Sequence, residues 1–502
     1  MKRALLMVLF LVVSQVTFSS CQKDRVTFVH ETDEHDPDPS GDKNRPIYHA
    51  IPNTGWTNES YGLIYHNDEY HMFFQKNETF LGIYKQNWGH FTSSDLVRWN
   101  EESAVLAPTP NSWDKEGCWS GASIILQDGT PAVVYTGVDG VKAGMGVATS
   151  NDNYATLQKS ENNPIIERAP SGVNEFRDPF VWYEDNRYHM IIGAGNGRGG
   201  CIVYYDSDDF ENWRGGTIAY QGVEATDGKF WEMPIVHRFD NGKWLLLVQD
   251  IPDDSGRACA FYWIGEFANG VFTPDNGESK KLELVNRFLS PTITVDQDNN
   301  LTAIGIIPDE VTGAFQAAQG WAHLFSVPQK WVLNSTNDAL VVTPHPNLDA
   351  IRGAQRTFSA IDISGGNNLG GYRGRHFEMD ATITLNGADK VGFTFGKSTD
   401  GREEYQIYYD VAAQRWMIDA TKSSLDPNAE GSLDLREGEP CRARSTIEAT
   451  IYVDGSVVEV FVDDEAHFTG RFYPTLDDAD GVEIFSEGGT ASADVTIYEM
   501  NN

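Results

Sequence analysis

The sequence is short of basic residues. Its 502 residues include 38 lysines and arginines against 73 aspartates and glutamates, which gives a formal net charge of −35. Nucleic acid and anionic lipid surfaces would be repelled by a protein of this charge, because both present closely spaced negative charges. The composition therefore argues against nucleic-acid binding and favours a neutral or cationic partner.

Cysteine is also scarce, with five residues in the whole chain. Cys21 belongs to the N-terminal leader, and the others are widely spaced: Cys118, Cys201, Cys259 and Cys441. None of them forms a CxxC pair, and none is separated from a histidine by the number of residues typical of zinc sites. The sequence therefore predicts no metal site. Buried free thiols are the favoured interpretation, although export would permit a disulfide.

Beyond its first twenty residues the chain lacks an apolar run that could span a membrane. Lys2 and Arg3 precede an apolar stretch, Ala4 to Phe18, which is too short to cross a bilayer comfortably. The stretch ends in Phe18-Ser-Ser-Cys21, which resembles a bacterial lipoprotein processing site. We expect residues 1–21 to be a signal peptide with Cys21 acylated, and the polar residues 22–45 to be a tether. The protein would then be exported and would touch the membrane only through its lipid anchor. An ordinary secretory signal is the alternative.

The body of the chain repeats a β-hairpin pattern. Polar turns begin at His66, Gln127, Glu184, Asp240 and Asp296, at intervals of 61, 57, 56 and 56 residues. Hairpins that recur at this spacing are typical of propeller blades. The pattern predicts an all-β protein with a five-bladed β-propeller over residues 46–335. A linker, with a possible short helix at 347–352, would occupy residues 336–353. Over residues 354–502 short strands recur at a different spacing, which predicts a β-sandwich.

Four residues stand six to eight positions before successive turns: Glu59, Ser120, Asp178 and Glu232. Equivalent places in successive blades surround a common axis, so the three carboxylates should meet in one pocket. Crowded carboxyl groups have separated pKa values, and cleavage of a glycosidic bond requires one protonated and one ionised carboxyl. We expect apolar neighbours to keep Glu232 protonated. Asn58 and Ser60 should keep Glu59 ionised, and Arg177 should keep Asp178 ionised.

Short motifs give the chain a family resemblance. They are Arg177-Asp-Pro179, Trp231-Glu-Met-Pro234, Trp119-Ser-Gly121, Phe74-Gln-Lys-Asn77 and Trp88-Gly-His-Phe-Thr-Ser-Ser-Asp-Leu-Val-Arg-Trp99. From about residue 46 to its end the chain resembles glycoside hydrolase family 32, the fructan hydrolases, inulinases, levanases and invertases. The resemblance implies a five-bladed propeller joined to a β-sandwich. It also implies hydrolysis of β-fructofuranosyl bonds in an oligo- or polysaccharide, with retention of configuration and without a cofactor.

The resemblance also implies roles for individual residues. Glu59 would be the nucleophile, Glu232 the general acid/base and Asp178 the residue that stabilises the transition state. The residues that would bind the sugar are Asn58, Gln75, Trp119, Ser120 and Arg177.

Three departures separate the chain from the family pattern. Glu59 stands where the family has an aspartate, so the nucleophile is one methylene longer. Ile83 or a neighbour replaces a tryptophan that usually precedes Trp88, and Ile235 replaces an aspartate after Pro234. Two alternatives therefore stay open beside a hydrolase of levan, inulin or sucrose. One is a hydrolase of another furanoside such as arabinan, and the other is a glycan-binding surface lipoprotein that has lost turnover.

Overall fold

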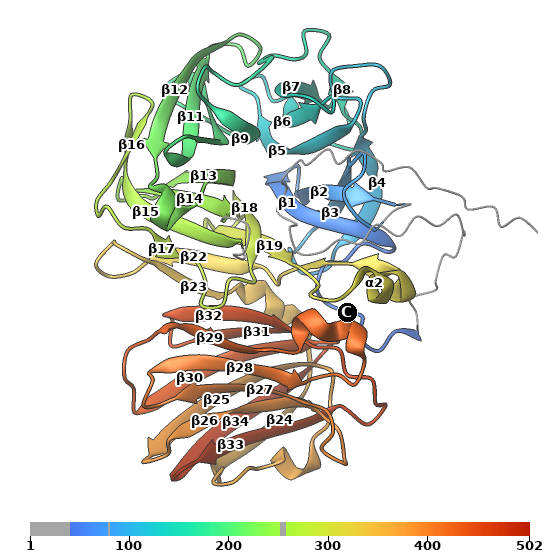
Figure 1. Ribbon diagram of the computed structural model, residues 1–502, viewed down its shortest axis with the longest axis vertical. Helices are drawn as coiled ribbons and strands as arrows, with labels where there is room; N and C mark the ends of the chain where they lie inside the picture. The colour runs from blue at the N-terminus through green and yellow to red at the C-terminus, as the bar shows by residue number, and fades with distance from the viewer. Residues whose placement is uncertain (1–40, 79–80, 252–257, 502) are drawn as a thin grey trace, which may run out of the picture.

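A ring of five β-sheet blades, followed by a two-layered sandwich, makes up the folded protein (Figure 1). The computed structural model describes residues 41–78, 81–251 and 258–501. The predicted signal peptide, Cys21 and most of the predicted tether lie outside the described residues. The predicted architecture, a propeller with a C-terminal sandwich, is confirmed.

Each blade is an antiparallel meander whose first strand lies next to the axis. The first blade is β1 (Gly55–His66), β2 (Glu69–Asn77), β3 (Asn87–Ser93) and β4 (Asn100–Leu106), and the second is β5 (Gly117–Ile125), β6 (Pro131–Val138), β7 (Ala143–Thr149) and β8 (Gln158–Lys159). The third is β9 (Asn174–Glu184), β10 (Arg187–Asn196), β11 (Gly199–Ser207) and β12 (Trp213–Gln221). The first strands of neighbouring blades contact one another around the ring.

The last two blades carry additional short strands. The fourth is β13 (Phe230–Arg238), β14 (Trp244–Ile251), β15 (Cys259–Ala268) and β16 (Val271–Pro274), with β17 (Lys280–Lys281) also paired to β15. The fifth is β18 (Leu289–Val295), β19 (Leu301–Ile307), β22 (Gln329–Leu333) and β23 (Leu340–Pro344), with β21 (Leu324–Phe325) also paired to β19. A short helix α1 (Glu224–Asp227) precedes the fourth blade, and α2 (Gly313–Gln319) follows β19.

All five predicted turns join the first and second strands of their blades. In two of them both central residues have positive φ, namely Asn67 and Asp68 in the first blade and Asp185 and Asn186 in the third. Tight hairpins need this backbone conformation, and asparagine and aspartate tolerate it better than most residues. The polar turn residues were therefore a sound guide to the blades.

The ring is closed by the segment between β19 and β22. Its short strand β20 (Trp321–Ala322) runs parallel to β1, with Gly55 opposite Trp321 and Trp56 opposite Ala322. The backbone N–H of Gly55 also donates a hydrogen bond to the carbonyl of Gly320, at 3.1 Å. The seam between the last and first blades is thus held by backbone hydrogen bonds.

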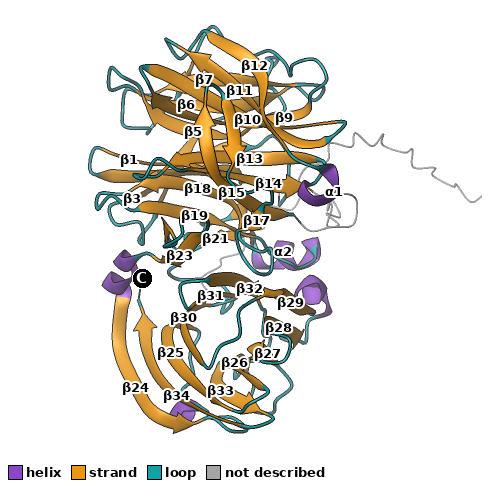
Figure 2. Cartoon of the chain, turned by 90° about the vertical axis from the view of Figure 1, so that its left-hand side faces the viewer, coloured by secondary structure: helices purple, strands orange, loops and turns teal. Residues whose placement is uncertain are grey.

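The C-terminal domain packs two sheets face to face (Figure 2). One sheet has the order β24 (Arg352–Asp362), β34 (Thr490–Met500), β25 (His376–Asn386), β30 (Thr446–Asp454), β31 (Val457–Val462) and β32 (Ala466–Arg471). The other has the order β29 (Leu435–Pro440), β28 (Arg415–Lys422), β27 (Glu404–Asp410), β26 (Lys390–Lys397) and β33 (Gly481–Glu487). Their facing side chains form one apolar core.

The two domains share a buried interface. An apolar cluster joins propeller residues such as Leu245 and Leu301 to Tyr452 and Phe461 of the sandwich. Within the interface Arg471 forms an ion pair with Asp309 at 2.6 Å, and both side chains are fully buried. The sandwich therefore packs directly on the propeller.

The domain boundaries differ slightly from those expected. Strand β23 pairs with β22, so the fifth blade runs to Pro344 and not to residue 335. The expected short helix is a 3-10 helix over Pro346–Ile351. At the other end Asp42 accepts a hydrogen bond from Trp321 of the propeller and Lys43 donates one to Asp477 of the sandwich. The last residues of the predicted tether thus already contact both domains.

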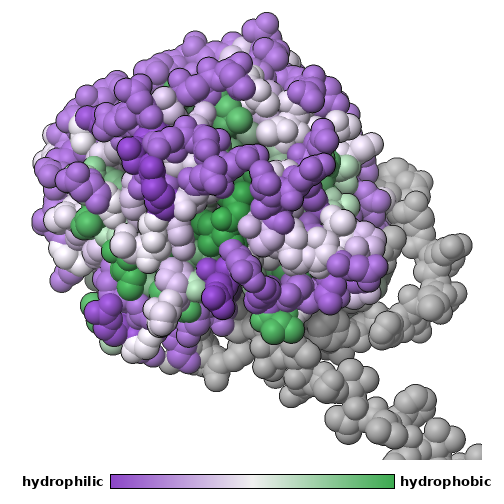
Figure 3. Space-filling view, turned by 90° about the horizontal axis from the view of Figure 1, so that it is seen from above, coloured by the Kyte–Doolittle hydropathy of each residue, from purple (hydrophilic) through white to green (hydrophobic). Residues whose placement is uncertain are grey.

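The side of the propeller that lies farthest from the sandwich is covered mainly by hydrophilic side chains, with a small apolar patch near the middle of the view (Figure 3).

The four cysteines outside the leader are free thiols, and Cys118, Cys201 and Cys259 are buried. Among the described residues no helix is long and apolar enough to cross a membrane. In the same part of the chain, no group of three or more His, Cys, Asp or Glu side chains could hold a metal ion.

Candidate active site

A β-bulge near the start of each innermost strand shapes the site. In β1, Thr57 and Ser60 lie opposite Lys76 and Phe74, so Asn58 and Glu59 face one partner residue. Equivalent register shifts occur in the other four blades, between Trp119 and Gly121, Arg177 and Pro179, Glu232 and Ile235, and Leu289 and Thr292. An extra residue in a strand bends it and re-aims the side chains beside it. The bulges explain why the site residues occupy the same place in successive blades.

Glu59 lies buried between the first two blades. One of its carboxylate oxygens, Oε2, accepts a hydrogen bond from Nε2 of Gln75 at 2.7 Å and another from the hydroxyl of Ser120. Gln75 Nε2 also donates to the Ser120 hydroxyl at 2.9 Å, and Asn58 Nδ2 donates to Gln75 Oε1 at 3.1 Å. The side chains of Asn58, Gln75 and Ser120 therefore form one network that orients Glu59.

Asp178 occupies the bulge of β9 with a φ of 59°, a left-handed conformation that is uncommon outside glycine. Its backbone N–H donates to the Thr136 hydroxyl at 2.8 Å, and its Oδ2 accepts from the backbone N–H of Met233 at 3.2 Å. These bonds tie Asp178 to the second and fourth blades, and only 3% of the residue is exposed.

Arg177 links the third blade to Glu232. Its Nε and Nη2 donate to Oε1 of Glu232 at 2.9 and 2.7 Å, while its Nη1 donates to Oε2 of Glu175 at 2.7 Å. The guanidinium also lies over the ring of Phe230, at 4.6 Å from the centroid. Arg177 is thus held in one orientation by two carboxylates and an aromatic face.

The three carboxylates predicted to meet do lie in one buried cluster, and their charges act on one another. Burial raises the pKa of Glu59 well above its usual range, and the negative charges of Asp178 and Glu232 raise it further. Burial and the charge of Glu232 raise the pKa of Asp178 to about 7. Three carboxylates facing one guanidinium cannot all ionise cheaply, so the ionisation of one opposes the ionisation of the others.

The partners expected for these carboxylates from their sequence neighbours were wrong in three respects. Arg177 bonds to Glu232 and Glu175, and Asp178 is left with the raised pKa described above. Glu232 is therefore paired with a cation, which its apolar sequence neighbours did not indicate. Ser60 donates to the carbonyls of Ser290 and Ile304, so neither it nor Asn58 is a direct partner of Glu59. Bulges turn adjacent side chains in different directions, which adjacency in sequence does not reveal.

Trp119, predicted to bind sugar, is half-buried at the start of β5. Its indole nitrogen Nε1 has no hydrogen-bond partner among the described residues. A side chain added at Gly117 would lie 2.7 Å from this nitrogen, so the glycine makes room for the indole.

Several neighbours of the site were not predicted from the sequence. Thr136, Glu175, Gln249 and Ser290 were not singled out, although the first two touch Asp178 and Arg177 directly. Gln249 lies opposite Glu232 and accepts hydrogen bonds from the N–H and hydroxyl of Ser290, at 2.8 and 2.7 Å. Ser290, with a φ of 42°, is the fifth blade's counterpart of the bulged residues. The turn spacing could have located it, because it stands six residues before Asp296.

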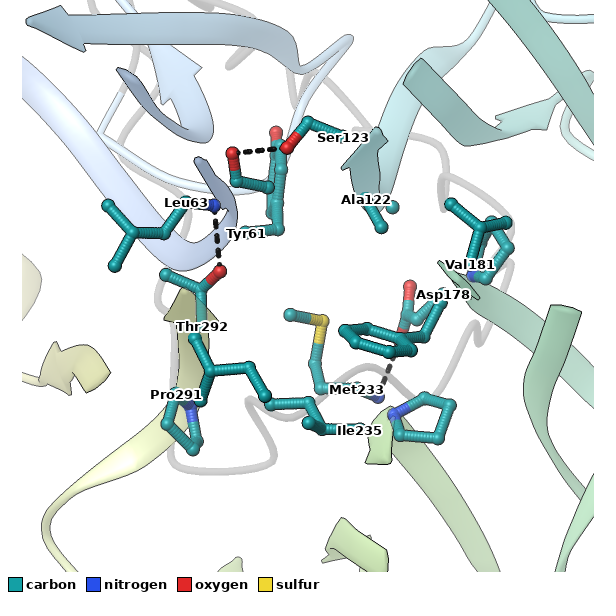
Figure 4. Close-up of a pocket in the computed structure, with 16 residues that line it drawn as sticks. Tyr61, Leu63, Ala122, Ser123, Asp178, Val181, Met233, Ile235, Pro291 and Thr292 are labelled. Atoms are coloured by element: carbon teal, nitrogen blue, oxygen red, sulfur yellow. Dashed lines mark hydrogen bonds between the residues drawn. The ribbon is translucent and has the colours of Figure 1, made fainter. Parts of the chain in front are cut away.

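A cavity of about 80 Å³ lies beside Asp178, where the innermost strands of the blades meet (Figure 4). All five blades contribute to its wall, including Tyr61, Ala122, Asp178, Met233 and Thr292. The hydrogen bond from the backbone N–H of Met233 to Asp178 joins two residues of this wall. The space is large enough for a few water molecules but too small for a sugar.

Comparison with known proteins places the chain among enzymes. The family model described as the glycosyl hydrolases family 32 N-terminal domain matches residues 49–344, and the family 32 C-terminal model matches residues 347–499. These matches define the class, a glycosidase that hydrolyses O-glycosyl bonds. The chain belongs to glycosyl hydrolase family 32, as the motifs had indicated.

Relatives match over most of the chain. A sucrose-6-phosphate hydrolase of Escherichia coli is 25% identical over 89% of this chain and 92% of its own length. A levanase of Bacillus subtilis is 25% identical over 91% of this chain and 70% of its own. The crystal structure of fructan 1-exohydrolase IIa from Cichorium intybus superposes with a TM-score of 0.82 at 21% identity, covering 92% of this chain and 98% of that one. This last likeness shows the shared fold.

Proposed function

We propose that this enzyme cleaves β-fructofuranosyl linkages in fructans such as levan or inulin, or in fructosides such as sucrose. The supporting observation is the buried cluster of Glu59, Asp178 and Glu232 at the blade bulges. The family membership and the printed activities of relatives, which include levanase, raffinose invertase and exo-inulinase, point to the same class of substrate.

The proposed mechanism is a double displacement with retention of configuration. The ionised carboxylate of Glu59 attacks the anomeric carbon while the carboxyl of Glu232 protonates the departing glycosidic oxygen. Glu232, now ionised, then takes a proton from water, which displaces Glu59 from the sugar. Asp178 accepts hydrogen bonds from ring hydroxyls, and Gln75 and Ser120 hold the attacking oxygen of Glu59 in place.

The test is incubation of the protein with levan, inulin, sucrose and arabinan, followed by chromatography of the products. We expect release of fructose or fructo-oligosaccharides, and a fall of at least about a thousandfold in kcat for Glu232→Gln, because the variant cannot donate the proton. The control is Glu184→Gln, which breaks an exposed ion pair with Arg238 on the same propeller. Release of arabinose alone would instead support a hydrolase of another furanoside.

A second candidate function follows from the raised pKa of Glu59. A protonated Glu59 cannot attack, so a glycan-binding protein without turnover would show the same electrostatics. That candidate requires sugar binding by calorimetry that survives Glu59→Ala, with no product from any substrate. Product formation that depends on Glu59 contradicts it.

We also propose that the protein is exported and anchored through a lipid on Cys21, a residue outside the described part of the chain. The supporting observation is the leader ending in Phe18-Ser-Ser-Cys21. Labelling of the expressed protein with a palmitate analogue should give a signal that Cys21→Ser loses. Equal labelling of both proteins would contradict the anchor.

A further inference from the structure

Glu175 stands just before the Arg-Asp-Pro segment and belongs to none of the groups discussed in the mechanism. It lies in a second bulge of β9, between the pairs Asn174–Gly195 and Arg177–Gly193. Its φ is 49°, a conformation that costs free energy for a residue with a side chain. A strained residue beside an active site suggests that its side chain is held there for a purpose.

The side chain of Glu175 bonds to Arg177. Its Oε2 accepts from Nη1 of Arg177 at 2.7 Å, while Nε and Nη2 of the same guanidinium bond to Glu232. Glu175 is 38% exposed at its side chain, whereas the side chains of Arg177 and Glu232 are 7% and 3% exposed. A carboxylate at the rim therefore shares one buried cation with the proposed acid/base.

Because Glu175 and Glu232 bond to the same guanidinium, the charge of Glu175 can affect the ionisation of Glu232. Among the described residues, the charged groups that act on Glu232 include Arg177 and Asp178 from β9 and Glu59 from β1. Arg177 is the cation of this cluster, and it supports the ionised form of any carboxylate that it contacts. A second carboxylate on the same guanidinium weakens that support, because it partly neutralises the cation.

We propose that Glu175 is a positioning residue that acts through Arg177 to keep Glu232 able to carry a proton at the pH of turnover. The proposal rests on the role of Glu232 under the proposed function. Without the negative charge of Glu175, Arg177 would favour ionised Glu232 more strongly. The general acid would then lose its proton at a lower pH.

The test uses Glu175→Gln, which keeps the shape and an acceptor for Arg177 but removes the charge. We expect the basic limb of the pH profile of kcat/KM to move down by about half to one pH unit, a size that allows for the partial exposure of Glu175. Glu175→Asp, which restores the charge, should move the limb back. Glu184→Gln, on the same strand but away from the site, should leave the limb in place.

A second readout does not depend on turnover. In protein labelled with ¹³C at the glutamate carboxyls, the Glu232 resonance, identified by its loss in Glu232→Gln, should titrate at a lower pH in Glu175→Gln. Profiles or titrations that superimpose on those of the unaltered protein, or that move to higher pH, overturn the role of Glu175. An inactive protein whose Glu232 resonance still shifts would contradict the proposed function alone.

Discussion

At the scale of single residues, the length of Glu59 is the most informative departure from the family pattern. Gln75 and Ser120 both bond to the same oxygen, Oε2, so the pocket is fitted to a carboxyl that reaches this far. The extra methylene is therefore accommodated by specific partners instead of being left unsupported.

We expect Glu59→Asp to lower kcat by about a hundredfold, because a retraction of roughly 1 Å removes the nucleophile from its partners and from the anomeric carbon. Steady-state kinetics on the best substrate will measure the change, with Glu59→Gln as the inactive reference. An increase in kcat for the aspartate variant would mean that the pocket is still shaped for the shorter side chain.

Asp178 should cost the protein stability at neutral pH. Its folded-state pKa of about 7 lies above the ordinary value of 3.8, so the folded protein binds more protons between these values. Stability from this group is greatest below pH 4 and declines as pH rises toward 7.

Asp178→Asn should therefore raise the free energy of unfolding by about 2 kcal/mol at pH 8, with little gain at pH 4, while abolishing turnover. Asparagine can still accept the hydrogen bond from Met233. Denaturant unfolding at the two pH values will measure the difference, and Asp240→Asn in an exposed turn is the control. An equal gain at both pH values would contradict the electrostatic explanation.

At the scale of elements, the bulged inner strands connect the fold to the chemistry. Gly121 follows the bulge that carries Ser120, and a Cβ at Gly121 would stand 1.9 Å from the carbonyl oxygen of Val134. The two strands approach so closely there that only glycine fits.

Gly121→Ala should destabilise the protein by about 1–3 kcal/mol, because the backbone of β5 must move away from β6. It should also lower kcat, since Ser120 and its bond to Glu59 move with the strand. Gly197→Ala, in a loop where the added atom meets nothing within 4 Å, is the matched control. Unfolding and kinetics of both variants will show whether the loss is specific to the bulge.

The elements also show what sequence could and could not predict. Turn residues with the right chemistry, such as Asn67-Asp68 and Asp185-Asn186, marked the hairpins, and their spacing brought Glu59, Asp178 and Glu232 to one place. The partner of each carboxylate depended on bulges that turn Arg177 toward Glu232 and not toward Asp178. Such local geometry involves residues from several blades, so neighbours in sequence could not reveal it.

At the scale of the whole molecule, the two domains meet at an interface that is both apolar and charged. His49, in the segment before the first blade, bonds to Asp454 and Glu459 of the sandwich at 2.8 and 3.0 Å. Burial lowers the affinity of His49 for a proton, but these carboxylates raise its pKa to about 9.

Removing one partner of the buried pair between Arg471 and Asp309 should be costly. We expect Arg471→Ala to reduce the free energy of unfolding by about 3–5 kcal/mol, because Asp309 would keep a buried charge without its cation. The exposed pair of Arg238 and Glu184 gives the comparison, and Arg238→Gln should cost less than about 1 kcal/mol. Calorimetry that finds the two variants equally stable would contradict the proposed importance of the interface.

Because β20 pairs with β1, closure of the propeller ring depends on a segment that is synthesised late. Chains emerge from the ribosome with the N-terminus first, so Gly55 and Trp56 are available long before Trp321 and Ala322, with which they pair. Until that late segment arrives, one edge of β1 lacks its partner. The strand that carries Glu59 therefore gains this parallel partner only after nearly the whole propeller has been synthesised.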